Sequence, residues 1–443
     1  MADQTLTDRG SDSAAGGPAL PSTFWQYVRS LGPGIVMVLT WLGGGNVVQS
    51  GVAGANYGYA LMWIVVIALM MRFVFVSIIA KYQLCNERGE GVLDGLARLH
   101  PWYAPFLALT ALTLGHIYNS YMLAGIGETC VNLSRVGYGW QWATFWAVVA
   151  LAMIFRPTFR RIELLFKGLL ALMAVSLLGT AIWAGPSMTG IVRGIVSFEL
   201  PPRAGGFDAL LVVIAMIGAL GGSIANLIYP YFLEQKGWRG PQYRRVQMYD
   251  FLLAIIVMIV FTLALWTLGA ELLYAKGDQI KNLGDLTNLL GTALGGAGTL
   301  LFYLGVFSVL FTSVVGQSMG LAWMATHGYL RWRQGPGELR SNYTVHPLYK
   351  LGILWIVLSP LVWTLPGMPD FVTLTLVANS LQVVLIPVLV GGVWWITASS
   401  RYIGAEYRNR WWENAAMVAL FAVALWAAWG SVESVTRVVR EMF

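Results

Sequence analysis

Two glycine-rich segments carry the chemistry most suited to binding a small ligand. One spans residues 42–46 (LGGGN), and the other spans residues 220–223 (LGGS) and is followed by Asn226. Each glycine disfavours a helix by about 1 kcal/mol, so adjacent glycines let the backbone unwind and present its carbonyl and N–H groups. In apolar surroundings such a backbone is tolerated only where it faces protein or a water-filled cavity. We therefore predict that both segments bind an ion or a small polar solute.

Polar side chains near these segments extend the predicted site. Asn and Gln weigh more than Ser or Thr, which in apolar helices commonly serve as packing residues. The predicted substrate-binding residues at or near the breaks are Gly43, Gly45, Asn46, Gln49, Ser223, Asn226, Tyr229 and Gln382. Asn46 and Asn226 are the candidate metal ligands among them. The alternative is that the glycines only allow helices to pack closely, but the presence of two such segments favours a binding site.

These segments must be held by membrane-spanning elements. Of the 443 residues, 57% are hydrophobic and only 11% are charged, whereas a typical soluble domain has about 25% charged residues. This composition excludes an ordinary soluble enzyme, a disordered chain and a nucleic-acid-binding protein, and it indicates a polytopic membrane protein. Continuous apolar stretches favour helices over a β-barrel. They predict eleven spans, at residues 31–57, 59–83, 102–131, 139–155, 162–184, 207–233, 248–275, 296–328, 349–367, 371–398 and 411–431.

The positions of the two glycine-rich segments suggest an internal repeat. They fall in the first and sixth predicted spans, and glycine-interrupted spans at matching positions of two halves typify the binding sites of secondary transporters. The predicted fold class is all-α. The expected organisation is a disordered cytoplasmic tail at 1–30, a first five-helix repeat at 31–200, a second, inverted repeat at 207–398, and an extra helix with a C-terminal tail at 411–443.

Basic residues set the expected orientation. With the N-terminus in the cytoplasm, twenty of the 28 Lys and Arg residues lie in the tail and inner loops, and seven lie in outer loops or at the C-terminus. Inner loops of membrane proteins are enriched in Lys and Arg, which accounts for the net charge of +7 without nucleic acid. We expect a multi-pass protein of the cell (inner) membrane with a cytoplasmic N-terminus.

Several segments together resemble a known family. Residues 31–63, which include the first glycine-rich segment, resemble the first two helices of the Nramp (natural resistance-associated macrophage protein) divalent-metal transporters. Residues 159–179, 301–324 and 380–389 are similar to later parts of that family, and the resemblance covers roughly residues 31–400. It implies the LeuT-type fold, with a 5+5 inverted repeat, broken helices 1 and 6, and alternating access around a metal site at the membrane midplane.

The sequence departs from the family pattern where the family binds metal. The first-helix Asp falls on Gly43, and the sixth-helix Met falls on Ala225, which the resemblance adds to the predicted substrate-binding residues. The acids of the third helix fall near Met122 and Gly125, and a tenth-helix Gln falls near Leu376. The chain therefore resembles a divergent, Nramp-related branch. Loss of the thioether at position 225 removes a preference for softer metals, whereas oxygen ligands suit a hydrated ion such as Mg²⁺.

Two functions are compatible with this pattern. The first is an Nramp-related secondary transporter that moves a divalent cation, with hydrated Mg²⁺ or Mn²⁺ as candidates, without strong proton coupling. The alternative is a LeuT-fold transporter of a small organic or zwitterionic solute, with no metal substrate, whose charged groups bind at the ends of the broken helices. A third interpretation is a receptor or structural membrane protein with a degenerate site. The expected partners are a small cation or solute and the lipid bilayer, and nothing in the sequence requires an oligomer.

Few ionisable residues lie at membrane depth, and each is by default a candidate for function. Glu128 and His116, both in the third predicted span, are the candidates for an ion or proton pathway. The alternatives are that Glu128 reaches water near the outer end of its helix and that His116 is a hydrogen-bonded packing residue.

The remaining ionisable residues have structural interpretations. Arg72 is expected to hold the inner part of the second helix in place, and the alternative is that it pairs with an acid or a carbonyl in the bundle. His327 is expected to face the inner water. Residues at span ends, which are expected at the membrane interface, are Asp208, Glu234 and Asp250.

Signals for catalysis and for cofactors are missing from the sequence. No nucleophile–base pair, metal-ligand cluster or phosphate-binding loop is recognisable, and two cysteines imply no disulfide framework. We therefore expect no catalytic residues, no enzymatic activity and no cofactor.

Overall fold

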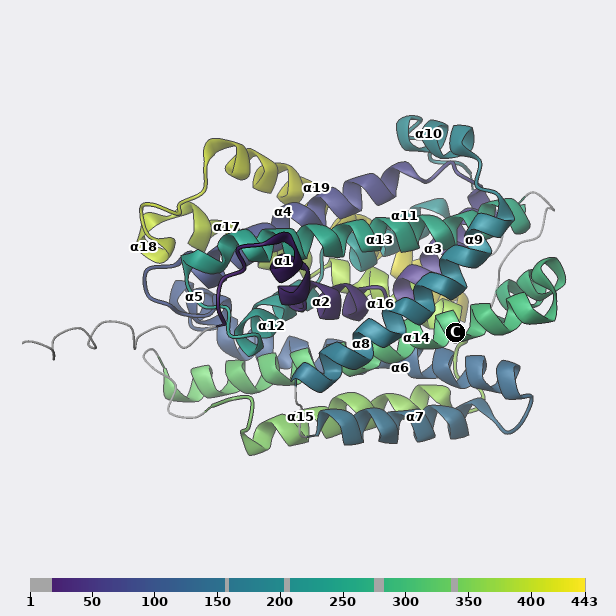
Figure 1. The fold of residues 1–443 in the computed structure, drawn as a ribbon, viewed down its shortest axis with the longest axis horizontal. Helices are drawn as coiled ribbons and strands as arrows, with labels where there is room; N and C mark the ends of the chain where they lie inside the picture. The colour runs from purple at the N-terminus through teal and green to yellow at the C-terminus, as the bar shows by residue number, and fades with distance from the viewer. Residues whose placement is uncertain (1–17, 156–158, 203–207, 275–282, 336–341, 443) are drawn as a thin grey trace, which may run out of the picture.

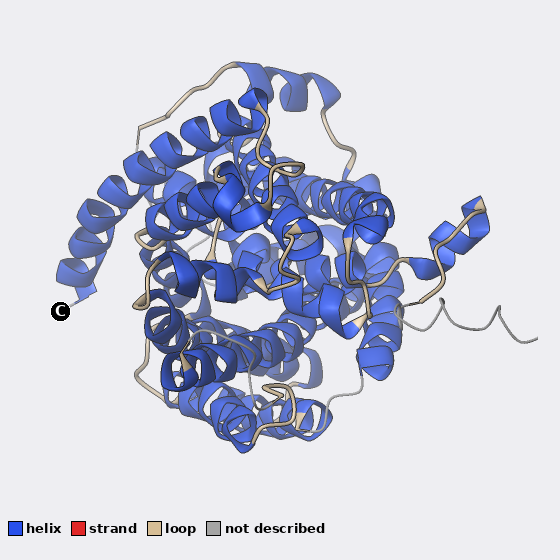
Figure 2. Ribbon diagram, turned by 90° about the vertical axis from the view of Figure 1, so that its left-hand side faces the viewer, coloured by secondary structure: helices blue, strands red, loops and turns tan. Residues whose placement is uncertain are grey.

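The computed structural model describes residues 18–155, 159–202, 208–274, 283–335 and 342–442. Helices dominate this part of the chain, and it contains no strand (Figures 1 and 2). The elements before residue 200 are α1 (Phe24–Ser30), α2 (Pro33–Trp41), α3 (Gly44–Tyr57), α4 (Trp63–Cys85), α5 (Val92–Leu99), α6 (Tyr103–Ser134), α7 (Gly139–Ile154), α8 (Phe159–Met173), η1 (Ala174–Leu178), α9 (Gly179–Ala184) and α10 (Met188–Val196). Those after it are α11 (Ala209–Met216), η2 (Ile217–Gly221), η3 (Ile224–Ile228), α12 (Tyr229–Gln235), η4 (Pro241–Tyr243), α13 (Arg244–Leu272), α14 (Leu283–Gln334), α15 (Pro347–Leu358), η6 (Ser359–Thr364), α16 (Phe371–Val383), α17 (Ile386–Ala398), α18 (Ser400–Ile403) and α19 (Trp411–Met442).

The predicted membrane spans correspond to helices of the structure. Within the described ranges, seven helices are long and apolar enough to cross a bilayer, and the bent pairs α2–α3 and α16–α17 bring the number to nine. The two other predicted spans, at 102–131 and 139–155, correspond to α6 and α7. The all-helical, membrane-spanning fold class is therefore confirmed.

The end of the predicted N-terminal tail differs from the expectation. Part of the tail lies outside the described residues, but Phe24–Ser30 forms helix α1. The Thr23 hydroxyl accepts from the Gln26 N–H at 3.4 Å, and the Gln26 side chain accepts from the Thr23 N–H at 3.2 Å. This reciprocal pair is a capping box, which starts a helix even in a polar segment.

Both glycine-rich segments interrupt their helices as predicted. Helix α2 ends at Trp41 and α3 begins at Gly44, with a bend of 53° between them. In the sixth span, α11 continues into the π-helical turn η2, after which Gly222 and Ser223 are extended, with φ angles of −153° and −155°. The chain then becomes helical again in η3 and α12. Adjacent glycines explain both interruptions, because they lower the helix propensity locally.

A third interruption separates α16 from α17 and was not anticipated from the sequence. The two helices are bent by 40°. Pro387 is the second residue of α17, and a proline has no N–H with which to continue the helical hydrogen bonds of the preceding turn. The tenth predicted span is thus bent near the polar residues that we expected it to contribute.

Close helix packing encloses the first break. Helix α13 packs along α3, and α6 packs along α14. Gly269 of α13 permits the first contact, because a Cβ there would lie 2.6 Å from the carbonyl oxygen of Gly51. Every residue of α3 is buried, so the break lies inside the bundle. Helices α1, α5 and α18 lie toward one end of its long axis and α10 toward the other (Figure 1).

Candidate functional site

The two glycine breaks face one small cavity inside the bundle, which we call the central cavity. It is lined by Trp41, Gly43, Gly45, Arg72, Tyr118, Tyr121, Met122, Gly218, Ala219, Ser223, Ala225, Gln317, Asn379 and Gln382. These residues belong to α2, α3, α4, α6, η2, η3, α14, α16 and the breaks themselves. Segments from both halves of the chain therefore build the cavity together.

The cavity includes part of the predicted substrate-binding set. The members that line it are Gly43, Gly45, Ser223, Ala225 and Gln382. The members that are buried elsewhere are Asn46, Gln49, Asn226 and Tyr229. Asn46 is directed to α13, where its Nδ2 donates to Thr262 Oγ1 at 3.0 Å, and its Oδ1 accepts from Ser50 Oγ at 2.8 Å. The break itself, rather than the polar residues that follow it, thus contributes to the cavity.

The two candidate metal ligands do not meet at the cavity. The Asn226 side chain is fully buried and has no hydrogen-bond partner in the described part of the chain, as is also true of Gln49. Asn46 has the partners given above. No group of three or more His, Cys, Asp and Glu side chains that could hold a metal ion occurs among the described residues. A cation in the central cavity would therefore have neutral groups as its protein ligands.

Side chains of α14 occupy the carbonyl groups at the end of α2. Ser313 Oγ donates to the Leu39 and Thr40 carbonyl oxygens, both at 3.0 Å. Gln317 Nε2 donates to the Thr40 carbonyl at 3.1 Å, while its Oε1 has no partner. The carboxyl end of a helix lacks internal partners for its last carbonyls, and here α14 supplies partners for two of them.

A chain of polar side chains connects α6 with α16 at the cavity. The Tyr118 hydroxyl donates to Gln382 Oε1, and Gln382 Nε2 donates to Asn379 Oδ1 at 2.7 Å. Asn379 Nδ2 in turn donates to the Thr375 carbonyl at 2.8 Å. These contacts orient the amide groups, so the polar surface of the cavity is preorganised.

Arg72 is the charged residue in the cavity lining, and it bonds to a backbone carbonyl, which was one of the two roles expected for it. It is the tenth residue of the 23-residue helix α4 and is only 1% exposed. Its guanidinium lies over the Trp41 ring, 4.4 Å from the ring centroid, and Nη2 donates to the Ala219 carbonyl at 2.7 Å. Arg72 therefore contacts residues next to both breaks, and it places a positive charge in the cavity.

Helix α6 contributes three lining residues that sequence reasoning did not select. Tyr118, Tyr121 and Met122 have the spacing of one helical face, and the same face continues to Gly125. That periodicity was readable, but an apolar helix does not reveal which of its faces turns inward. Met122 places a thioether in the cavity from a helix other than the one that carries Ala225.

The surroundings of Gly43 leave little room for the carboxylate that the family has there. A Cβ at Gly43 would lie 2.7 Å from Ser313 Oγ and 2.9 Å from Met122 Cε. Ser313 and Met122 therefore fill the space that an acidic side chain at position 43 would need.

Glu128 and His116 lie on α6 outside the cavity lining. Glu128 faces the start of α16, beside Asp370 and the Phe371 N–H. His116 Nδ1 lies 2.7 Å from Ser359 Oγ, and its Nε2 accepts from the Trp363 indole at 2.9 Å. Their role in an ion or proton pathway remains a prediction.

Asp250, which we expected at the membrane interface, is enclosed by protein. It is fully buried, and its carboxylate accepts from the Gly32 N–H at 2.9 Å and from the Gly34 N–H at 2.5 Å. A carboxylate bound to the first N–H groups of a helix is stabilised by them and by the helix dipole. Asp250 thus fixes the start of α2 to α13.

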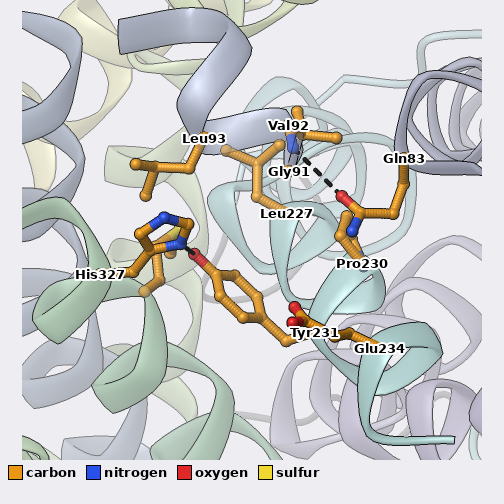
Figure 3. A pocket seen from close by; sticks show the side chains of 10 residues that line it. Gln83, Gly91, Val92, Leu93, Leu227, Pro230, Tyr231, Glu234 and His327 are labelled. Carbon is orange, nitrogen blue, oxygen red and sulfur yellow. Dashed lines mark hydrogen bonds between the residues drawn. The ribbon is translucent and has the colours of Figure 1, made fainter. Parts of the chain in front are cut away.

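His327 does not face water either, because it is only 4% exposed. Its Nδ1 lies 3.1 Å from the Tyr231 hydroxyl, beside a second pocket between α5, α12 and α14 (Figure 3). Its Nε2 lies 3.0 Å from Asp94 Oδ1, to which Arg331 Nε donates at 2.6 Å. Burial alone would raise the pKa of Asp94, but His327 and Arg331 outweigh it and hold this pKa below its ordinary value. We call Asp94, His327 and Arg331 the Asp94 cluster.

Comparison with known proteins identifies related sequences. A family model described as "Natural resistance-associated macrophage protein-like" matches residues 34–432. A divalent metal cation transporter MntH of Verminephrobacter eiseniae is 24% identical, over 86% of this chain and 83% of the relative. An MntH of Mycobacterium tuberculosis is 27% identical, over 89% of this chain and 90% of the relative.

Solved structures share the fold. A manganese transporter of Eremococcus coleocola, crystallised with an aromatic bis-isothiourea compound, has a TM-score of 0.73 at 16% identity, covering 97% of this chain and 92% of that one. MhsT in complex with L-phenylalanine has a TM-score of 0.57 at 14% identity, covering 91% of this chain and 98% of that one. These likenesses confirm the LeuT-type fold.

Proposed function

Because this chain belongs to the Nramp family, we propose that it is a secondary transporter that moves a divalent metal cation by alternating access. The relatives named above are divalent metal cation transporters, and this chain matches each of them over most of its length. The observation that carries the proposal for this chain is the central cavity, which the two interrupted helices share. Interrupted helices around one cavity are the usual construction of a transporter binding site.

Hydrated Mg²⁺ or Mn²⁺ is the proposed substrate. The cavity offers amide and hydroxyl groups from Gln317, Asn379, Gln382 and Ser223, and no carboxylate belongs to its lining. Oxygen ligands suit these hard cations, and Mg²⁺ in particular keeps several of its waters. A hydrated ion needs fewer charged ligands than a bare one, because its water shell is retained.

Weak proton coupling is the second part of the proposal. Met122 and Gly125 occupy the positions near which the family has its third-helix acids, and Met122 lines the cavity. Glu128 and His116 lie on the same helix, and they are the candidates for any proton path that exists. We expect an imposed proton gradient to change the uptake of the cation little.

Location and organisation follow the sequence predictions. We propose that the protein resides in the cell (inner) membrane with a cytoplasmic N-terminus, that it is not an enzyme, and that residues 31–200 and 207–398 act as two inverted repeats. The loop charges support the orientation, and the two interrupted helices, at matching positions, support the repeat.

Uptake of Mn²⁺ and Mg²⁺ into liposomes that contain the purified protein tests the proposal. We expect uptake above that of protein-free liposomes. Gln317→Ala removes a cavity amide and should lower uptake about fivefold, the effect of one hydrogen bond of about 1 kcal/mol. Ser308→Ala is the matched control, because Ser308 lies on the same helix and bonds only to the Leu304 carbonyl. Absence of uptake for every divalent cation would refute the metal substrate.

A second candidate function is transport of a small organic or zwitterionic solute without metal. Arg72 favours it, because a guanidinium in the cavity attracts negative groups and repels cations. Stabilisation of the protein by an organic metabolite, but not by metal ions, would favour this candidate.

A further inference from the structure

Arg72 is a buried charge without a compensating charge. None of the described carboxylates lies within ion-pair distance of it. Tyr118, which is an ionisable neighbour, is neutral in its ordinary state. Removing an arginine from water costs several kcal/mol unless an opposite charge compensates it, and charges at membrane depth are by default functional.

The guanidinium also retains hydrogen-bonding capacity. Nη2 donates to the Ala219 carbonyl, and Nη1 makes a weak contact with Met258 Sδ at 3.4 Å. Nε is buried and has no hydrogen-bond partner among the described residues. The planar fork of an arginine matches the two oxygens of a carboxylate better than any other side chain does.

The helix ends at the break add to the same preference. Helix α3, which has 14 residues, begins at Gly44, and the flanking Gly43 and Gly45 line the cavity. The N-terminus of a helix carries a partial positive charge and free N–H groups, which favour an anion. The opposite end, the carboxyl end of α2, is where a cation would bind, but Ser313 and Gln317 already occupy two of its carbonyls, those of Leu39 and Thr40.

The central cavity has a volume of about 20 Å³, which is room for one water molecule, so a larger ligand requires the lining helices to move apart. We propose that the opened central cavity binds a small carboxylate on Arg72 and the N-terminus of α3, and that this carboxylate crosses the membrane together with the divalent cation. The joint transport rests on the proposed function, whereas the carboxylate site does not. A dication next to a buried guanidinium is repelled, but a carboxylate between them attracts both. The transported anion thus replaces the acid that Gly43 lacks.

Binding of malonate to the purified protein tests the carboxylate site. Malonamide has the same shape without the charge, so it is the matched control ligand. We expect malonate, but not malonamide, to raise the Tm. Arg72→Gln should weaken malonate binding about tenfold, because it removes a charge-assisted hydrogen bond. Arg72→Lys keeps the charge and loses the planar fork, so it should bind malonate with intermediate strength.

Two outcomes of the binding experiment would overturn the carboxylate site. One is equal stabilisation of wild-type protein by malonamide and malonate. The other is undiminished malonate binding by Arg72→Gln, because binding at full strength would show a folded variant that does not need the guanidinium.

Uptake of radiolabelled Mn²⁺ and malonate into liposomes tests the joint transport of the carboxylate and the cation. We expect malonate to stimulate Mn²⁺ uptake about tenfold in the wild type and not in Arg72→Gln. Mn²⁺ uptake that is equal with malonate and malonamide would overturn the joint transport and leave the proposed function intact. Malonate uptake that needs no divalent cation would support the carboxylate site and refute metal as the cargo.

Discussion

The Asp94 cluster and the central cavity treat buried charge in opposite ways. In the cluster, Asp94 contacts both His327 and Arg331, and similar pairs occur between Lys81 and Glu413 and between Glu163 and its two lysines. In the cavity, Arg72 has a carbonyl and an aromatic ring as its neighbours but no carboxylate among the described residues. Breaking a buried pair is costly because it leaves the partner uncompensated. The comparison suggests that paired charges stabilise this fold, whereas the unpaired charge serves a ligand.

The largest expected effect is on the paired side of this comparison. Asp94→Ala leaves His327 and Arg331 without their carboxylate and should lower the free energy of unfolding by about 3 kcal/mol. Asp370→Ala is the control, since Asp370 caps α16 at 2.9 Å from the Val372 N and such a cap contributes about 1 kcal/mol. Denaturant unfolding in detergent measures both. Equal losses would mean that the cluster is no more than a helix cap.

The second prediction places an acid in the cavity. Gly43→Asp requires the flexible side chains of Ser313 and Met122 to shift. It should then give Arg72 an internal counter-ion and reduce the stimulation of Mn²⁺ uptake by malonate about tenfold, or by about 1.4 kcal/mol. Gly43→Asn adds nearly the same volume without the charge and controls for the contacts with Ser313 and Met122. If both variants lose the stimulation equally, space rather than charge is responsible.

The third prediction removes the unpaired charge. Arg72→Met should leave the free energy of unfolding unchanged or raise it by up to about 1 kcal/mol in the absence of anions, because the cost of burying a lone charge disappears. Thermal unfolding without carboxylates measures this. A large loss of stability would instead support the simpler idea that Arg72 only holds α4 in place.

The smallest effect concerns pH. The depressed pKa of Asp94 means that its stabilisation is fully present above the ordinary carboxyl pKa of about 3.9 and is lost as the pH falls through the lower value of the folded state. The Tm difference between the wild type and Asp94→Asn should therefore stay constant from neutral pH down to about 5 and shrink below about 4. A difference that already shrinks near pH 6 would contradict the depressed pKa of Asp94.

The elements could be predicted from the sequence because their signals are local. Long apolar runs located the spans, and adjacent glycines at 43–45 and 221–222 located both breaks. Lining residues were harder, since they depend on how helices rotate about their axes. Asn46 follows a break directly and yet turns to Thr262, whereas Gln317 and Tyr118 lie far along the chain and reach the cavity.

The hydrogen-bond partners of the ionisable residues also could not be predicted from the sequence. The positions of Asp250 and His327 at span ends suggested contact with water, but both are buried by polar groups distant in the chain. Arg72 was recognised as unusual from its depth, yet only the structure shows that its neighbours are Trp41 and Ala219, next to the two breaks.

The attachment of α2 at both of its ends has a mechanical consequence. Asp250 of α13 binds its first N–H groups, and Ser313 and Gln317 of α14 bind the Thr40 carbonyl near its end. A nine-residue half-helix held in this way behaves as a stiff lever between two supports, not as a flexible flap. It can tilt only if the hydrogen bonds at one of its ends break, so any tilt of α2 must begin at one of these two supports.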